Sequence, residues 1–566
     1  MKRFFALAAL AVAMFATSAS AALPLVVIGA GTGQPVRTPY CQEFDRTLSA
    51  DSLYLITGLY YVESGYSLTI EPGTVILGDS ETGGTLIVTR GAQIFAQGTQ
   101  QKPIVFTSEK AIGARAPGDW GGIIVLGSAP VNKVDPLIEG GLIFGNCNNN
   151  SGTYGGNVPN DNSGVISYVR IEFAGYRFQQ DNEVNGLTLG GVGSGTQIDH
   201  VQVSYSNDDS YECFGGTVDC AYLVAFGGTD DEFDSDFGYR GKMQFLFGLR
   251  DPDNSDPTGQ SNGYESDNDG SSSSTATPYT RPLYVNATLV GPERTDALVG
   301  AWFGTYEYSA VLRRSTQTSI YNSVIMGYPW GLSLRDATTQ NWATTDTLQI
   351  RNTHVQATLT PTGSTHIHDE TRWSSVDTWF TTGSFNNVGL ATSNPSSVML
   401  TNMTNLDDPD PRPAVGSPLI GTASYSNPRL SGCVVTNYKG AFDPNATKNE
   451  LWTYYWTDFD PQNTDYGMGL PTAIGDAPVY GEKLAQNYPN PFNPQTSIDF
   501  TMPANGHVTL DVYDVSGGLV ATLVDGIETA GRHTVRFNAE GLASGVYFYR
   551  LRGNGFNEMR KMVLLK

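Results

Sequence analysis

Basic residues are scarce in this sequence. Lysine and arginine number 33 against 56 aspartates and glutamates, so the formal net charge is −23, and charged residues make up only 16% of the chain. The acidic excess lies before Asp476, because the segment from there onward is nearly neutral. Such a chain repels nucleic acid and anionic membranes and attracts cations. We therefore expect no nucleic-acid partner and look for cation sites.

Short catalytic motifs are missing as well. The sequence contains no glycine-rich phosphate loop, no GxSxG turn and no HExxH motif. Its five cysteines include no CxxC pair, which leaves a thiol redox centre or a zinc ribbon without support. Cys213 and Cys220 are close enough in sequence to pair, and they are the candidate disulfide. The odd number leaves at least one cysteine unpaired or bonded to another chain.

The N-terminus has the three parts of a secretory signal peptide. Lys2 and Arg3 supply positive charge, residues 4–15 are apolar, and Ala21 ends a small-residue cleavage site. We therefore expect residues 1–21 to be removed after Ala21, and export permits disulfides. No later stretch of about 18 continuous apolar residues follows, so we expect no transmembrane segment.

The residue composition and strand pattern of the chain change at about residue 484. The segment 484–494 is rich in proline and predicts an extended entry into a strand. Short alternating strands separated by glycine-containing turns follow it. This pattern is typical of a small Ig-like β-sandwich, which we place at residues 484–566, after a linker at 476–483.

Four segments of this region resemble the type A sorting domain of the bacterial type IX secretion system. They are NYPNPFNP, VYDVSGGLV, AGRHTVRFNAEGLASGVYFYRL and the terminal KMVLLK. Gly518 stands where arginine is common in that family, and Phe537 where tryptophan is common. The resemblance implies the type IX secretion machinery as a partner, attachment to surface lipopolysaccharide, and a secreted or outer-surface location in a Gram-negative-type bacterium. An ordinary Ig-like stalk is the alternative.

The middle of the chain is repetitive. Short apolar strands with glycine-rich corners recur at about 20 residues between positions 50 and 400. This period predicts an all-β fold, a right-handed parallel β-helix (solenoid) over residues 22–475, because stacked coils bury one continuous core. A β-propeller is the rival, but its blades need about 40–50 residues each. We expect six apolar residues to point into the core in parallel register: Leu187, Val201, Val203, Tyr222, Val224 and Phe245.

A small polar residue occupies one slot near the start of several of these strands. Asparagine at such a slot tolerates the left-handed conformation and can form a side-chain ladder. The slot residues are Ser167, Asp199, Asn286, Asn322 and Asn352. Three longer segments also resemble β-helical surface proteins of bacteria that use the same secretion route: ESGYSLTIEPGTVILG, DWGGIIVLGSAPVN and YKGAFDP…WTYYWTDFDP.

Acidic turns follow successive strands at about 21–22 residues, so stacking would bring them side by side. Neighbouring carboxylates repel one another unless a cation or a basic side chain lies between them. Calcium suits such a site because it takes 6–8 oxygen ligands in irregular geometry. A solvated acidic face neutralised by Arg240, Lys242 and Arg250 is the alternative. The candidate metal ligands are Asp208, Asp209, Asp230, Asp231, Asp251 and Asp253.

Two functions of different classes stay open. The first is an exported, non-catalytic surface protein with a calcium-stabilised β-helix: an adhesin, a glycan-binding protein or a surface-layer component. The second is a carbohydrate-active enzyme, a polysaccharide lyase or glycoside hydrolase, acting on extracellular polysaccharide. Asp234 and Asp236 alternate on one face of an extended segment and are its candidate acid/base pair, because glycoside hydrolysis uses two carboxylates about 5–10 Å apart.

Two weaker patterns complete the candidates. His366 and His368 would share one strand face and supply two ligands of a transition-metal site, although exposed loop residues are the favoured interpretation. Aromatic residues gather in the later coils, where exposed rings would stack on sugars and buried rings would fill the core, the commoner outcome. The tryptophans concerned are Trp302, Trp330, Trp342, Trp373 and Trp379.

Overall fold

The structure is a computed structural model of the chain. It describes residues 23–466 except 135, 139–146, 148–151, 179–183, 258, 272–273, 294–304, 359–372, 392–394 and 404, and residues 484–565 except 485–486, 488–489, 503–505, 516, 529–530 and 554–555. The predicted cleavage site at Ala21, the linker at 476–483, Trp302 and the pair His366 and His368 lie outside the described residues.

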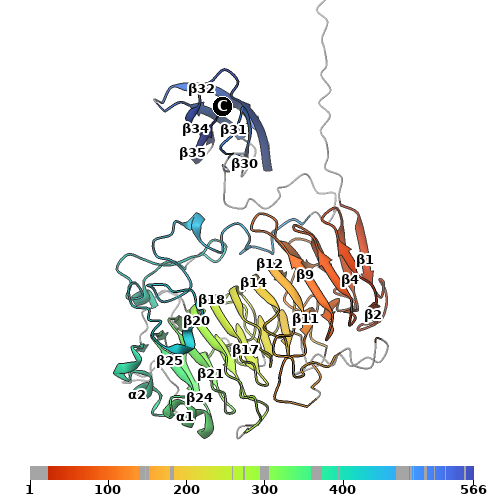
Figure 1. Ribbon diagram of the computed structural model, residues 1–566, viewed down its shortest axis with the longest axis vertical. Helices are drawn as coiled ribbons and strands as arrows, with labels where there is room; N and C mark the ends of the chain where they lie inside the picture. Colours follow the sequence, from red (N-terminus) through yellow and green to blue (C-terminus); the bar gives the residue numbers. More distant parts are fainter. Residues whose placement is uncertain are drawn as a thin grey trace, which may run out of the picture.

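Parallel strands stack into a β-helix over residues 25–391, as predicted (Figure 1). Each coil sends one strand to a ten-stranded sheet and the rest to a seventeen-stranded sheet. The ten-stranded sheet contains β2 (Pro39–Gln42), β5 (Leu59–Val62), β8 (Thr85–Val88), β11 (Gly122–Leu126), β13 (Leu187–Gly190), β15 (Tyr211–Phe214), β17 (Phe233–Asp236), β19 (Tyr264–Ser266), β21 (Tyr308–Leu312) and β24 (Trp330–Leu334).

The seventeen-stranded sheet is bent along its length, so the coil has three sides. Its central strands are long enough to span both halves: β12 pairs with β9 through its first half and with β10 through its second half. Its members are β1 (Leu25–Gly29), β3 (Arg46–Leu48), β4 (Leu53–Thr57), β6 (Ser67–Ile70), β7 (Val75–Gly78), β9 (Gln93–Gln97), β10 (Ile104–Ser108), β12 (Gly164–Glu172), β14 (Gln197–Ser204), β16 (Cys220–Phe226), β18 (Lys242–Leu249), β20 (Leu283–Val290), β22 (Ser319–Tyr321), β23 (Val324–Tyr328), β25 (Gln349–Arg351), β26 (His354–Ala357) and β27 (Val388–Ala391).

A column of left-handed residues makes the bend. One residue in each central strand has φ between 50° and 64° and is skipped in the strand register: Tyr168, His200, Tyr222, Phe245 and Asn286, followed in the next two coils by Asn322 and Asn352. The three asparagines therefore occupy left-handed positions, as predicted. The prediction was wrong for Ser167 and Asp199. They lie one residue before the left-handed position and pair with each other in the register of β12 and β14.

The bend also explains an error in the predicted core. Leu187, Val201 and Val203 lie in the core of the coil, as expected. Tyr222, Val224 and Phe245 instead belong to a second cluster outside it. Val201 pairs with Leu223, one residue after the predicted Tyr222, and Leu223 pairs in turn with Leu246. A slip of one residue exchanges the two faces of a strand.

The segment from 395 to 466 covers the outer face of the seventeen-stranded sheet. Phe442, Leu451 and Trp456 pack there against the outward-facing Phe226 and Phe247. The segment runs back along the coils, because Gly440 donates to the carbonyl of Asn322, Asp458 exchanges hydrogen bonds with Gln202, and Gly113 donates to Gln462. Its regular elements are η2 (Pro395–Val398), β28 (Leu400–Asn402), β29 (Asp410–Pro413), η3 (Pro428–Leu430) and η4 (Lys448–Glu450).

Helices are few and short. Besides η2, η3 and η4, the described residues contain α1 (Ala337–Thr344), α2 (Val376–Phe380) and η1 (Gly383–Phe385). Asp336 caps α1 by accepting from the backbone N–H groups of Thr338 and Thr339. Within the described residues, no helix is long and apolar enough to cross a membrane.

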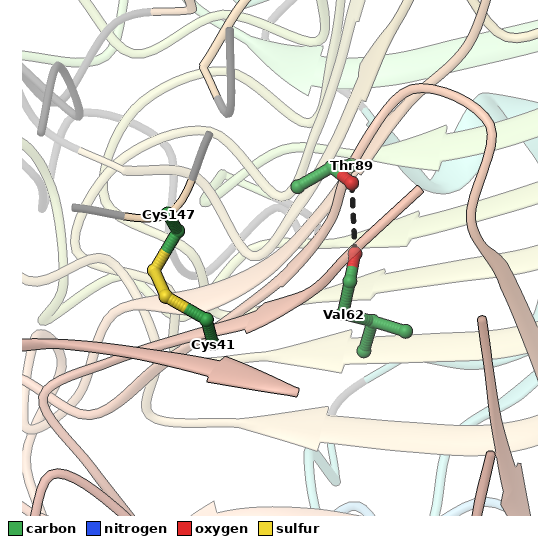
Figure 2. The surroundings of a disulfide bond; sticks show 4 residues. All are labelled: Cys41, Val62, Thr89 and Cys147. Carbon is green, nitrogen blue, oxygen red and sulfur yellow. Dashed lines mark hydrogen bonds between the residues drawn. A yellow bond between two sulfur atoms is a disulfide. The ribbon is translucent and has the colours of Figure 1, made fainter. Parts of the chain in front are cut away.

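The predicted disulfide is wrong. All five cysteines are described, and Cys41 pairs with Cys147 across 106 residues, with the two Cα atoms 5.5 Å apart (Figure 2). Cys213 and Cys220 are free and buried in the coil core, on strands of the two different sheets. Closeness in sequence is a poor guide here, because successive strands of one coil face each other across a packed core. The bridge instead joins Cys147 to Cys41 on β2.

This arrangement predicts the thiol count. The unreduced protein, denatured in guanidinium, should titrate with three thiols, since one bridge removes two of the five cysteines. In the native protein we expect the half-exposed Cys433 to react alone, because burial shields the other two. A count of one thiol after denaturation would show that Cys213 and Cys220 had paired after all.

The C-terminal domain is a two-layer antiparallel β-structure, as predicted. One layer pairs β30 (Gln495–Met502) with β33 (Gly531–Asn538). The other has the order β32 (Leu519–Glu528), β31 (Gly506–Tyr513), β34 (Gly545–Gly553) and β35 (Phe556–Leu564). Residues of both layers, among them Ile498, Phe500, Leu510 and Tyr549, share one hydrophobic core.

Candidate metal centre

The turns that lead into the ten-stranded sheet form a side-chain ladder. The carboxylate of Asp209 accepts from the backbone N–H of Asp231 in the next coil, at 2.8 Å. Asp231 accepts in turn from Asn262 at 2.7 Å, and Asn262 from Tyr308 at 3.0 Å. Each acceptor satisfies a backbone donor that the turn leaves unpaired. The ladder therefore holds consecutive acidic turns in register.

Carboxylates of two successive turns and of the strands that follow them, β15 and β17, meet beside this ladder. Oxygen atoms of Asp208, Asp209 and Asp230 lie within 4.8 Å of one another, and so do those of Asp209, Glu212 and Asp234. Glu212 and Asp234 are direct partners in the pairing of β15 with β17. Asp209 belongs to both groups and is buried. We call Asp208, Asp209, Glu212, Asp230 and Asp234 the acidic cluster.

The electrostatics of the acidic cluster disfavour its full ionisation. Burial and the neighbouring carboxylates, Asp231 foremost, raise the pKa of Asp209 well above its usual range. Burial and Asp231 do the same to the pKa of Asp230, and burial and Asp236 to that of Asp234. Carboxylates in this state keep their negative charges at neutral pH only when cations neutralise them.

Basic side chains serve the neighbouring acids. Arg313 pairs with Glu265 and with Asp267, the latter at 2.9 Å. Arg250 is fully buried, lies 3.6 Å from Glu232, and donates to the backbone carbonyls of Gly228 and Asn262. Three basic residues were expected to neutralise the acidic turns. Arg250 pairs with Glu232 and Lys242 pairs with Asp219 at 3.4 Å, while Arg240 is exposed.

Two buried polar residues lie beside Glu212 of the acidic cluster. Asn185 donates through its amide nitrogen to Glu212, while its amide oxygen has no hydrogen-bond partner among the described residues. Thr188 on β13 is the register partner of Glu212 on β15, and its hydroxyl likewise has no hydrogen-bond partner among the described residues. Both residues are only 1% exposed. Orphaned oxygens beside clustered carboxylates are the arrangement that a hard cation satisfies.

The structure separates the predicted ligands. It brings Asp208, Asp209 and Asp230 together. Asp231 forms part of the ladder instead, and Asp251 accepts from Tyr205 at 3.3 Å and from the backbone of Asp253. The predicted stacking of acidic turns fails at the third turn, which contains Asp251, because the residues after β18 make a long excursion. Asn262, and no aspartate of that turn, follows Asp231 in the ladder. Asp253 is exposed.

Glu212, Asn185 and Thr188 were missed by the sequence reasoning. The signal for Glu212 was available in the strand pattern, since Glu212, Asp234 and Glu265 occupy equivalent outward positions in YECF, FDSD and YES. The candidate acid/base pair lies on the same sheet: Asp234 and Asp236 are both half-buried on β17, two residues apart and on its outward face. Strand geometry spaces such residues by about 6.5 Å.

The tryptophans of the later coils mostly pack in or against the core of the coil. Trp379 is buried in the coil core, and Trp342 and Trp373 pack against it. Trp330 is half-buried at the start of β24. Aromatic rings in the later coils therefore give little support to a sugar-stacking face there.

Comparison with known protein families gives two matches. Residues 40–397 match the family described as a pectate-lyase like beta helix domain. Residues 486–565 match the secretion system C-terminal sorting domain. No curated protein matches the chain. The sorting domain marks the protein as secreted or displayed at the cell surface and makes the secretion machinery its partner.

Proposed function

The chain belongs to the family of pectate-lyase-like β-helix domains and carries a secretion sorting domain, and from this premise we propose that it is a non-catalytic surface protein whose β-helix is stabilised by calcium. Its role would be that of an adhesin, a glycan-binding protein or a surface-layer component. A rigid, repetitive body suits each of these roles, because every coil contacts only its neighbours and extends the surface without altering the fold.

The acidic cluster carries this proposal. One calcium ion bound by Asp209, Glu212 and Asp234 would also satisfy the orphaned oxygens of Asn185 and Thr188. That set supplies five side-chain oxygen donors, and water completes the 6–8 ligands that calcium takes. Because Asp209 also approaches Asp208 and Asp230, the same ion relieves the repulsion between two successive coils.

Calcium should therefore raise the melting temperature of protein first stripped with chelator. A ligand that binds only the folded state stabilises it by about 2.7 kcal/mol at a concentration 100-fold above its dissociation constant. Asp209→Asn should reduce the response, because it removes the shared charge and keeps an acceptor for the ladder. Asp253→Asn is the matched control, an exposed acid outside the cluster. If millimolar calcium did not change the melting temperature, the calcium site would be contradicted and the acidic cluster would be a solvated acidic face.

A carbohydrate-active enzyme is the second candidate, and the outward pair Asp234 and Asp236 favours it. Burial and Asp236 raise the pKa of Asp234, as a general acid requires. Reducing ends and unsaturated products should then accumulate when the protein is incubated with extracellular polysaccharides, and Asp236→Asn should abolish them without altering the melting temperature. Calcium-dependent stability without any product would support the non-catalytic role.

A further inference from the structure

A hollow lies between the outer face of the seventeen-stranded sheet and the segment that covers it. It has a volume of about 630 Å³, which is within the usual range of small-molecule sites. Tyr222 and Phe245 form one side, and residues 434–438, 441–443, 446 and 450–452 form the other. The hollow is separate from the acidic cluster, which lies on the turns into the ten-stranded sheet.

Aromatic rings dominate the hollow because the left-handed column places side chains outside the coil. His200, Tyr222 and Phe245 stack along that column with centroids 4.6 and 4.9 Å apart. On the opposite side Trp452 stacks on Phe442, with centroids 5.3 Å apart and ring planes at 11°, and its edge meets Tyr222. The rings that line the hollow are Tyr222, Phe245, Tyr438, Phe442 and Trp452.

The charge of the hollow has one sign. Asp443 and Glu450 line it and are exposed, and the described residues of its lining include no lysine, arginine or histidine. Burial and the Asp443 carboxylate raise the pKa of the Tyr438 phenol above its usual range. Lys242 and Lys448 are not among the lining residues, and they pair with Asp219 and Asp408.

Apolar side chains are also left exposed at this hollow. Val434 is 55% exposed and Val435 is 73% exposed, although both line it. Contiguous exposed apolar surface next to a hollow is typical of a binding site. A ligand here would therefore contact ring faces, methyl groups and carboxylates together.

We propose that this hollow binds an organic ammonium group, a quaternary or protonated amine. Five aromatic rings with two carboxylates and no basic residue attract a large, weakly hydrated cation through cation–π and charge interactions. Acidic ligands are repelled, and a neutral apolar ligand gains nothing from Asp443 and Glu450. The proposal is independent of the calcium site, because no residue is shared.

Choline and its uncharged isostere 3,3-dimethylbutan-1-ol test the proposal on the full chain. Calorimetric titration at matched ionic strength should show choline binding at least about tenfold tighter than the isostere. Saturating calcium and Asp209→Asn should leave choline binding unchanged, which separates this site from the acidic cluster. The double variant Asp443→Asn/Glu450→Gln should weaken choline binding by about tenfold, whereas Asp51→Asn, an exposed acid in an early coil, should not.

The source of the ammonium group is distinguished by a second pair of probes. Tighter binding of a glucosamine tetramer than of choline would identify an amino group carried on a polymer, and weaker binding would identify a small free cation. Equal binding of choline and its isostere overturns the proposal, as does unchanged binding of choline to the double variant. Should that variant fail to fold, the isostere comparison on the unaltered protein still decides.

Discussion

Replacing Arg170 by methionine should lower the free energy of unfolding by about 3–5 kcal/mol, the usual result of breaking a buried ion pair. The Arg170 guanidinium lies 3.3 Å from Glu172 and 3.4 Å from Asp458, and all three side chains are buried. Tyr466 donates to Glu172 at 2.8 Å. Methionine keeps much of the volume but leaves two carboxylates facing each other without a cation. Urea denaturation followed by circular dichroism measures the change.

The loss should depend on pH in a defined direction. Burial raises the pKa of Glu172 in the folded protein, and Arg170 opposes that rise. A carboxyl whose pKa is raised by folding stabilises the fold at low pH and loses that contribution as pH rises through its folded-state pKa. The variant should therefore recover part of its stability as pH falls from neutral towards 5. Lys448→Met, which removes an exposed ion pair with Asp408, should cost less than about 1 kcal/mol. A similar small loss for Arg170→Met would contradict the buried network.

Deleting residues 484–566 should abolish display at the cell surface while the β-helix still folds. The domain has its own core, and its sequence matches the sorting domain of the secretion system. The truncated protein should accumulate inside the outer membrane, and its thermal transition after purification should match that of the full β-helix. Cell fractionation and surface proteolysis measure the distribution. Fusion of residues 476–566 to a folded reporter with a signal peptide is the converse test. Truncated protein that still reached the surface would contradict the sorting role.

The architecture was accessible from the sequence because stacked coils repeat their pattern. Strand recurrence at about 20 residues predicted parallel pairing, and the motifs of the last 80 or so residues predicted the sorting domain. The phase within each repeat was harder to predict. Tyr222 and Phe245 look like ordinary apolar strand residues, yet their left-handed backbone turns them outward and moves the core position to Leu223 and Leu246.

The acidic cluster was only partly predictable for a related reason. Asp208, Asp209 and Asp230 follow the repeat period and were found by it. Asn185 and Thr188 carry no charge, and their importance lies in hydrogen-bond donors and acceptors that only the folded arrangement leaves unpaired. The same limit applies to Cys41 and Cys147, which lie 106 residues apart, so their spacing in the sequence does not indicate that they pair.

The covering segment decides where a mechanical load enters the molecule. A solenoid pulled through its last coil would peel apart one coil at a time, since each coil is held only by its neighbours. Here the chain leaves the final coils, runs back along the outer face, and is fastened by Tyr466 to Glu172 on β12 and by Arg115 to the carbonyls of Pro461 and Thr464. Tension applied beyond residue 466 therefore meets a strap lying in shear across several coils. Shear stretches many contacts at once, so rupture under force should require a higher load than unzipping of the terminal coil.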